Sequence, residues 1–144
     1  MLLLLLSIVV LLLLTHKLDI FFSKSFSSNQ NNIQQDISKW NVGKVTSMYS
    51  MFAGSGFNNN ISHWDVSRVT SMGLMFSGVF NQDISKWTIT SMTTLKTTFS
   101  GASAFNQDLS KWDVSRITSL ESTFSSASSF NQVSKKIQAR PVPL

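Results

Sequence analysis

The sequence predicts a repeat solenoid of about four stacked units of 23–25 residues, each with a short parallel β-strand plus a turn or short helix. The tryptophans stand 24, 23 and 25 residues apart, at Trp40, Trp64, Trp87 and Trp112. A phenylalanine follows each of them by twelve residues, at Phe52, Phe76, Phe99 and Phe124. Another precedes the last three tryptophans by seven residues, at Phe57, Phe80 and Phe105. One such unit cannot bury its own apolar face, whereas stacked units cover one another.

Each unit follows the pattern I-S-x-W-x-V-x-x-V-T-S-M-x-x-M-F, which indicates where the elements lie. We expect the strands around the Asp-Ile-Ser step, at residues 35–38, 59–62, 82–85 and 107–110, about 4.8 Å apart. The V-T-S-M-x-x-M-F segment suits a helical turn or short helix. Stacking places Trp on Trp and Phe on Phe, and side chains that each bury about 150–250 Å² form the core.

Three segments lie outside the repeats, which occupy residues 33–132. Residues 1–25 contain the apolar stretch LLLLLSIVVLLLL and are interpreted as a signal peptide or a short membrane anchor. Residues 26–32 form a polar linker or a degraded cap, and residues 133–144 form a basic tail. The leader predicts an extracellular or cell-surface location, with membrane contact only through the N-terminal segment if that segment is not cleaved.

Three stretches of the repeats carry a resemblance to a known family: FNQDISKW at residues 80–87, FNQDLSKWDVSRITSL at residues 105–120 and WDVSRVTSMGLMF at residues 64–76. They resemble the BspA-like, DUF285 class of leucine-rich-repeat surface proteins. The resemblance runs from about residue 33 to residue 132 and implies a leucine-rich-repeat solenoid, displayed outside the cell, with adhesion as its role. The third unit departs from the pattern, because Thr88 replaces the aspartate after the tryptophan and Ser91 replaces a basic residue.

The residue types present exclude several kinds of site. The chain has no cysteine, which excludes disulfides, thiolate metal sites and a cysteine nucleophile. Its two histidines, His16 and His63, are far apart and give little material for a zinc site or a catalytic triad. No phosphate loop, nucleophile elbow or dinucleotide fingerprint occurs. We therefore expect a protein that is not an enzyme, with no catalytic residue, no cofactor and no metal.

Aspartate recurs at two positions of the unit, and both are interpreted as turn residues. It stands four residues before the tryptophan or one residue after it, at Asp36, Asp65, Asp83, Asp108 and Asp113. A periodic carboxylate of this kind accepts backbone N–H groups, and no DxDxDG calcium loop is present. In the second unit the position holds Asn60, which begins an N-glycosylation sequence that has meaning in a secreted eukaryotic protein.

The net charge of +5 raises the question of nucleic acid, which we do not expect as a partner. The basic residues alternate with acidic ones, no exposed aromatic residue is expected to stack on bases, and the leader directs the protein away from nucleic acid. The positive surplus favours anionic glycans or lipid surfaces instead.

The predicted function is binding of a surface protein or glycan, without catalysis. The position nine residues after each tryptophan differs in every unit and forms the candidate interaction surface of Tyr49, Gly73, Lys96 and Glu121. One alternative is binding to ice or another crystal surface through a row of threonines at Thr46, Thr70, Thr93 and Thr118. Another is a structural repeat protein of no independent activity. Ends without a capping unit also predict end-to-end self-association.

Overall fold

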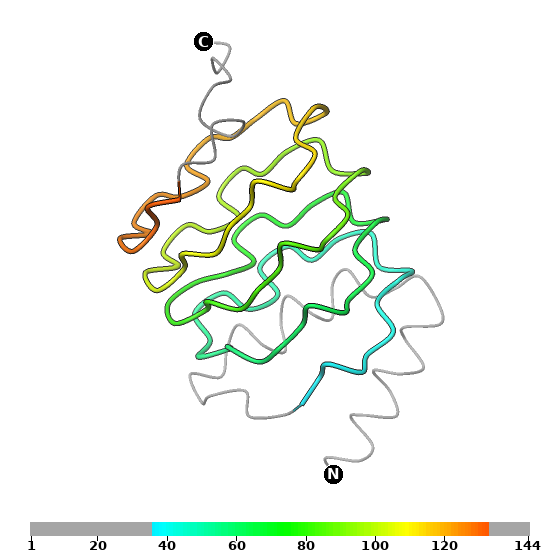
Figure 1. Ribbon diagram of the computed structural model, residues 1–144, viewed down its shortest axis with the longest axis horizontal. Coiled ribbons are helices and arrows are strands. Elements are labelled where there is room, and N and C mark those ends of the chain that lie inside the picture. The colour runs from blue at the N-terminus through cyan, green and yellow to red at the C-terminus, as the bar shows by residue number, and fades with distance from the viewer. Residues whose placement is uncertain (1–35, 133–144) are drawn as a thin grey trace.

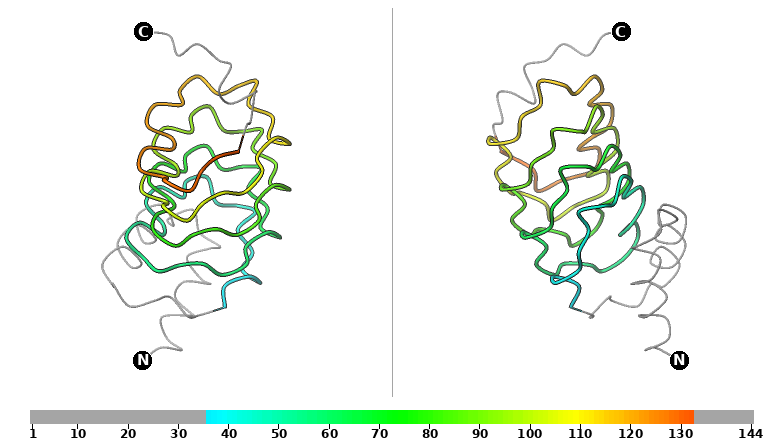
Figure 2. Two further views of the ribbon diagram at one scale, coloured as in Figure 1. Left: turned by 60° about the vertical axis from the view of Figure 1, so that its left-hand side comes forward. Right: turned by 90° about the vertical axis from the view of Figure 1, so that its right-hand side faces the viewer.

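The computed structural model describes residues 36–132, which wind into a coil of stacked turns (Figure 1). We number the turns one to four, at residues 36–56, 57–79, 80–104 and 105–129. Each turn lies beside the next in all three side views, from cyan to orange (Figures 1 and 2). The described residues contain no helix and no strand, and their regular pairing consists of two isolated parallel bridges, Ser47–Ser71 and Thr94–Ser119.

The Asp-Ile-Ser steps form tight turns, so the prediction of strands at residues 35–38, 59–62, 82–85 and 107–110 is wrong where the structure describes them. In turn four, Asp108 Oδ1 accepts the N–H of Ser110 at 2.8 Å, and the Trp112 N–H donates to the Leu109 carbonyl at 3.0 Å. The same two bonds recur in the other three turns. An acceptor this close competes with a strand ladder for the backbone N–H, which is why the chain bends here.

The same five-residue motif occurs a second time directly after the tryptophan. Asp113 Oδ1 accepts the N–H of Ser115 at 3.0 Å, and the Ile117 N–H donates to the Val114 carbonyl at 3.1 Å. The sequence shows the relation, since DLSKW at residues 108–112 is followed by DVSRI at residues 113–117. In both copies the second and fifth residues are buried and the basic fourth residue is exposed. Each turn of the coil therefore begins with two consecutive corners.

The V-T-S-M segment, where we expected a helical turn or short helix, instead makes the parallel bonds between turns. The Thr70 N–H donates to the Thr46 carbonyl at 2.8 Å, and the Met48 N–H donates to the Ser71 carbonyl at 2.8 Å. Turns three and four are joined in the same register. The helical turn follows this pairing, where the Met51 N–H donates to the Met48 carbonyl at 3.2 Å.

Two positions in each turn have a left-handed backbone, ten and fourteen residues after the tryptophan. The first holds Ser50, Leu74, Thr97 and Ser122, with φ between 51° and 58°. The second holds Gly54, Gly78, Gly101 and Ser126, with φ between 58° and 77°. This conformation costs a residue with a side chain about 1–2 kcal/mol, which explains the glycines in the loops between the phenylalanines.

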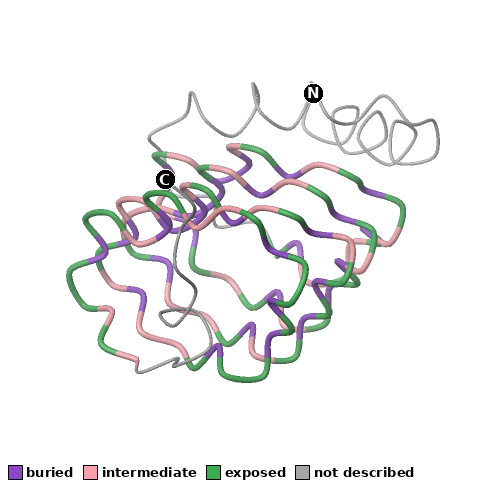
Figure 3. Ribbon diagram, turned by 90° about the horizontal axis from the view of Figure 1, so that it is seen from above, coloured by how far each residue is buried: buried purple, intermediate pink, exposed green. Residues whose placement is uncertain are grey.

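The core consists of two parallel columns of phenylalanine rings that run along the stack. One column joins Phe52, Phe76, Phe99 and Phe124, with ring centroids 5.4–6.2 Å apart. The other joins Phe57, Phe80, Phe105 and Phe130, with centroids 5.9–6.2 Å apart. The columns also stack on each other, at 3.7–4.2 Å. Phe therefore packs on Phe, as predicted, and the buried residues line the inside of the coil (Figure 3).

The tryptophans fasten each turn to the one before it. The indole N–H of Trp64 donates to the Ile37 carbonyl at 3.2 Å, and the indoles of Trp87 and Trp112 make the equivalent bonds at 3.1 Å. Each of these rings lies 6.1 Å from a phenylalanine of the preceding turn. Trp64, Trp87 and Trp112 are buried core residues, as predicted, and Trp40 is partly buried against the core. The ring partner of each of the three buried tryptophans is a phenylalanine, not another tryptophan.

Asparagine and glutamine side chains form a ladder along the stack that we did not predict. Asn81 Oδ1 accepts the N–H of Asn106 and the side-chain amide of Gln107, both at 2.9 Å. Asn58 and Asn106 accept the corresponding groups of the turns that follow them. The F-N-Q sequence thus satisfies the backbone where the chain passes from one turn to the next.

Candidate interaction surface

The four residues of the predicted interaction surface lie side by side, one in each turn. A Cβ atom at Gly73 would lie 3.0 Å from two ring carbons of Tyr49 and 3.5 Å from the Lys96 carbonyl oxygen. The Lys96 Nζ atom lies 2.8 Å from Glu121 Oε2. The column of Tyr49, Gly73, Lys96 and Glu121 is therefore continuous along the stack.

The local chain explains why this position faces outward. It follows a residue whose side chain points into the core, as at Met48, Met72 and Leu95. It precedes the first left-handed residue, where the chain turns away. A side chain between these two positions lies on the outer side of the bend, where core packing does not restrict which residue occurs. The position can consequently differ from turn to turn without changing the fold.

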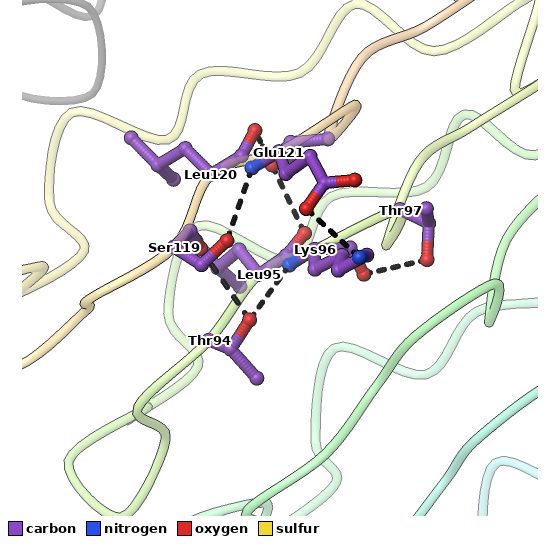
Figure 4. A network of polar contacts seen from close by, with 8 residues as sticks. Thr94, Leu95, Lys96, Thr97, Ser119, Leu120 and Glu121 are labelled. Carbon is purple, nitrogen blue, oxygen red and sulfur yellow. Dashed lines mark hydrogen bonds and ion pairs between the residues drawn. The ribbon is translucent and has the colours of Figure 1, made fainter. Parts of the chain in front are cut away.

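Figure 4 shows how the backbone holds the charged end of the column. The Leu95 N–H donates to the Ser119 carbonyl at 3.0 Å, which sets turn four against turn three. The Lys96 N–H donates to Thr94 Oγ1 at 3.1 Å, and the Glu121 N–H donates to Ser119 Oγ at 3.3 Å. Both charged residues therefore start from backbone positions that are fixed by hydrogen bonds.

The column presents three different chemical groups to solvent. Tyr49 is 50% exposed, and the side chains of Lys96 and Glu121 are 52% and 59% exposed. An ion pair this exposed contributes only about 0–1 kcal/mol, so either charge can exchange its partner for a ligand at little cost. The tyrosine ring lies over the glycine and supplies an amphipathic contact surface.

Sequence reasoning missed two exposed apolar residues, Leu74 and Val79. They are 36% and 51% exposed, and with Tyr49 they are the large exposed apolar side chains of the described residues. Leu74 follows Gly73 directly and extends the column. A signal for it was present in the sequence, since the other three turns carry serine or threonine at that position.

The aspartates act as turn residues, as predicted. Hydrogen bonds from Ser38, Ser67, Ser85 and Ser110 lower the pKa of Asp36, Asp65, Asp83 and Asp108 respectively below its usual value. Their carboxylates are thus held ionised at the corners of the coil. Within residues 36–132 no group of three or more His, Cys, Asp or Glu side chains could hold a metal ion.

The remaining sequence-predicted residues lie on the surface apart from this column. Asn60 is exposed, and its Oδ1 accepts the Ser62 N–H at 2.9 Å. The threonines of the predicted row, Thr46, Thr70, Thr93 and Thr118, are all exposed. The hydroxyls of Thr70 and Thr118 each donate to the threonine carbonyl of the turn before, at 3.0 Å.

Three predicted segments, residues 1–25, 26–32 and 133–144, lie outside the described residues. In the part that the structure describes, no helix has the length and apolar character needed to cross a membrane.

Comparison with known proteins gives one family. The family model described as "Mycoplasma protein of unknown function, DUF285" matches residues 20–139. No curated protein and no solved structure matched the chain. Because the family model covers most of the sequence and all of the repeats, the chain belongs to the DUF285 family.

Proposed function

We propose that the chain is a BspA-like leucine-rich-repeat protein that acts outside the cell, or on its surface, as a non-catalytic interaction module. The observation that carries the proposal is the column of Tyr49, Gly73, Lys96 and Glu121. It places a different side chain at the same point of each turn, on a scaffold whose tryptophan and phenylalanine positions recur. Such a variable, outward column is the usual recognition surface of a repeat protein.

The chemistry of the column suits a protein or glycan partner. Tyr49 offers a large contact area with few rotatable bonds, which keeps the entropic cost of binding low. Lys96 and Glu121 offer charges of both signs next to it, and Leu74 adds an apolar group. Several weak contacts spaced along one edge bind together more tightly than any of them alone.

The proposal is tested by screening the full chain against arrayed glycans and cell-surface proteins. The triple variant Tyr49→Ser, Lys96→Ser and Glu121→Ser removes the column and leaves neither charge without its partner. A matched control replaces three exposed cations of another column, Lys39, Lys86 and Lys111, by serine. We expect the first variant to weaken binding of a captured partner at least tenfold and the control to change it less than threefold. Equal binding by wild type and triple variant would overturn the proposal.

A second candidate is binding to ice or another crystal surface. The exposed row of Thr46, Thr70, Thr93 and Thr118 favours it, because the stack repeats one hydroxyl-bearing side chain in every turn. Thermal hysteresis of the full chain tests it, with Thr93→Lys as the disrupting variant. Hysteresis that Thr93→Lys abolishes supports this candidate, and freezing at the equilibrium temperature excludes it.

A further inference from the structure

The junction between turns two and three lacks a backbone hydrogen bond that both of the other junctions contain. At those junctions the Thr70 N–H donates to the Thr46 carbonyl at 2.8 Å, and the Thr118 N–H donates to the Thr93 carbonyl at 2.7 Å. The equivalent bond at the middle junction would join the Thr93 N–H to the Thr70 carbonyl. Within residues 36–132 neither of these two groups has a hydrogen-bond partner.

The next bond along the same edge is missing as well. At the outer junctions the N–H groups of Met48 and Leu95 donate to the following turn at 2.8 Å and 3.0 Å. The Met72 N–H would donate to the Thr94 carbonyl in the same way, yet neither group has a partner among the described residues. The two missing bonds are consecutive, so they leave a gap in the middle junction, bounded by residues 70–72 and 93–94.

Turn three also lacks a side chain that fastens turn four. The Arg116 guanidinium of turn four donates to the Thr90 carbonyl of turn three at 3.3 Å. Turn three carries Ser91 at the position of this arginine, and a serine side chain is too short to reach the turn before it.

The rest of the middle junction is closed. The Phe76 ring lies 5.4 Å from the Phe99 ring, and the Trp87 indole donates to a carbonyl of turn two at 3.1 Å. The asparagine ladder also continues across it, at 2.9 Å. Turns two and three are therefore joined at the ring columns and at the F-N-Q segment, and apart along the V-T-S-M segment.

The gap divides the candidate interaction surface into two chemically different halves. Turns one and two carry Tyr49 and Gly73, with the exposed Leu74 beside them. Turns three and four carry the ion pair of Lys96 and Glu121. A movement at the gap would therefore change the distance between an apolar half and a charged half of the column.

We propose that the junction between turns two and three is a hinge, which opens along the gap and pivots on the phenylalanine columns. Opening is easiest where the fewest bonds must break, and two of the bonds that close the outer junctions are already absent here. The use of this hinge in binding rests on the proposed function. It lets the apolar and the charged half of the column fit a partner separately.

Amide hydrogen exchange of the full chain, followed by NMR under conditions where it stays folded, tests the hinge. The Phe76 N–H donates across the middle junction close to the gap, and the N–H groups of Phe52 and Phe99 are the equivalent donors at the outer junctions. We expect the Phe76 amide to exchange at least tenfold faster than the other two. Fraying from the chain ends predicts the opposite order. Exchange of Phe76 that is as slow as that of Phe52 and Phe99 would overturn the proposal.

A disulfide across the gap provides a second test, since the chain has no cysteine of its own. The double variant Thr70→Cys and Thr93→Cys, when oxidised, should slow exchange of the Phe76 amide at least tenfold relative to its reduced form. The matched control, Thr93→Cys with Thr118→Cys, places a disulfide across an outer junction and should change it less than threefold. Equal slowing by both disulfides would overturn the proposal. Because neither measurement includes a ligand, the hinge can fail while the column still binds a partner, and a failed binding screen leaves the hinge intact.

Discussion

The junction between turns two and three differs from the two junctions beside it. The outer junctions each contain a parallel bridge and a bond between stacked threonines. At the middle junction the Leu74 N–H donates to the Thr97 carbonyl at 3.2 Å, one residue away from the register used elsewhere, and the Phe76 N–H returns to the common register at the Thr98 carbonyl, at 3.1 Å. The phenylalanine column crosses it without a break, since Phe76 and Phe99 lie 5.4 Å apart, compared with 6.2 Å for Phe52–Phe76 and 5.4 Å for Phe99–Phe124.

The difference coincides with the turn that departs from the repeat pattern. Turn three carries Thr88 and Ser91 where its neighbours carry aspartate and arginine. One bond of the backbone ladder therefore shifts at this junction, whereas the aromatic columns and the indole bonds continue through it. We expect the rings to contribute more to the stability of the stack than the ladder does.

Removing an indole side chain should lower the free energy of unfolding by the same amount at an outer junction and at the middle junction. Trp64→Ala and Trp87→Ala each delete a buried ring and its bond to the preceding turn. We expect each to lower the free energy of unfolding by about 3–5 kcal/mol, measured by urea denaturation. The exposed Lys86→Ala, a matched control, should change it by no more than about 0.5 kcal/mol. A much larger loss for Trp64 than for Trp87 would show that the ladder, and not the ring, dominates.

Breaking the asparagine ladder should have the next largest effect. Asn81→Ala removes the acceptor of the Asn106 N–H and the Gln107 amide, which are partly buried, and should cost about 1–3 kcal/mol. Asn58→Ala removes the equivalent acceptor at the middle junction, where the bonds are exposed and water can replace them. Its cost should be smaller. Equal unfolding midpoints for Asn81→Ala and wild type would mean that the ladder contributes nothing.

Several features of the stack could be predicted from spacing alone. Similar intervals of 23 and 25 residues between Trp64, Trp87 and Trp112 place like residues in like positions, and the phenylalanine columns follow from that. The position of Tyr49, Gly73, Lys96 and Glu121 was also predictable, because only a residue outside the core can differ in every turn. These predictions depend on repetition, which a single sequence displays directly.

The local conformation could not be predicted in the same way. The D-I-S step has an apolar residue between polar ones, which suits a strand as well as a turn. Only the bond from the Ser110 N–H to Asp108 Oδ1 decides between them. The asparagine ladder was missed because Asn81 and Asn106 bond across turns, and no local rule of spacing describes such a bond.

Turns three and four each bury a threonine at the same position, and the two hydroxyls differ in hydrogen bonding. Thr98 and Thr123 stand eleven residues after the tryptophan, where turns one and two have Met51 and Met75. The Thr123 hydroxyl donates to the Leu120 carbonyl at 2.7 Å, whereas the buried Thr98 hydroxyl has no partner. Thr98→Val should stabilise the fold by about 1 kcal/mol, and Thr123→Val should destabilise it by a similar amount, as measured by thermal and urea unfolding. Two substitutions of the same sign would contradict this assignment.

The smallest effect that we expect is a loss of folding stability at low pH, caused by the aspartates at the corners of the coil. The pKa of Asp83 is lowered by the N–H and hydroxyl of Ser85, and the pKa of Asp108 is lowered in the same way by Ser110. A carboxyl whose pKa is lower in the folded state stabilises the fold above its unfolded pKa, about 3.9, and loses that contribution as the pH falls through the folded value. Unfolding midpoints in urea should therefore fall between about pH 5 and pH 2.

The double variant Asp83→Asn and Asp108→Asn isolates this contribution. An amide oxygen can replace the carboxylate, since Asn60 accepts the Ser62 N–H at 2.9 Å in turn two, the same distance as the Asp83–Ser85 bond. The circular dichroism spectrum of the variant at pH 7 should match that of wild type. Its urea midpoint of unfolding should fall less than that of wild type when the pH is lowered. Because Asn60 lacks a titrating group, the corner at Asn60 shows that an amide can make this turn without a carboxylate. A variant that is as acid-sensitive as wild type would show that the acid response arises from carboxyl groups other than these two corners.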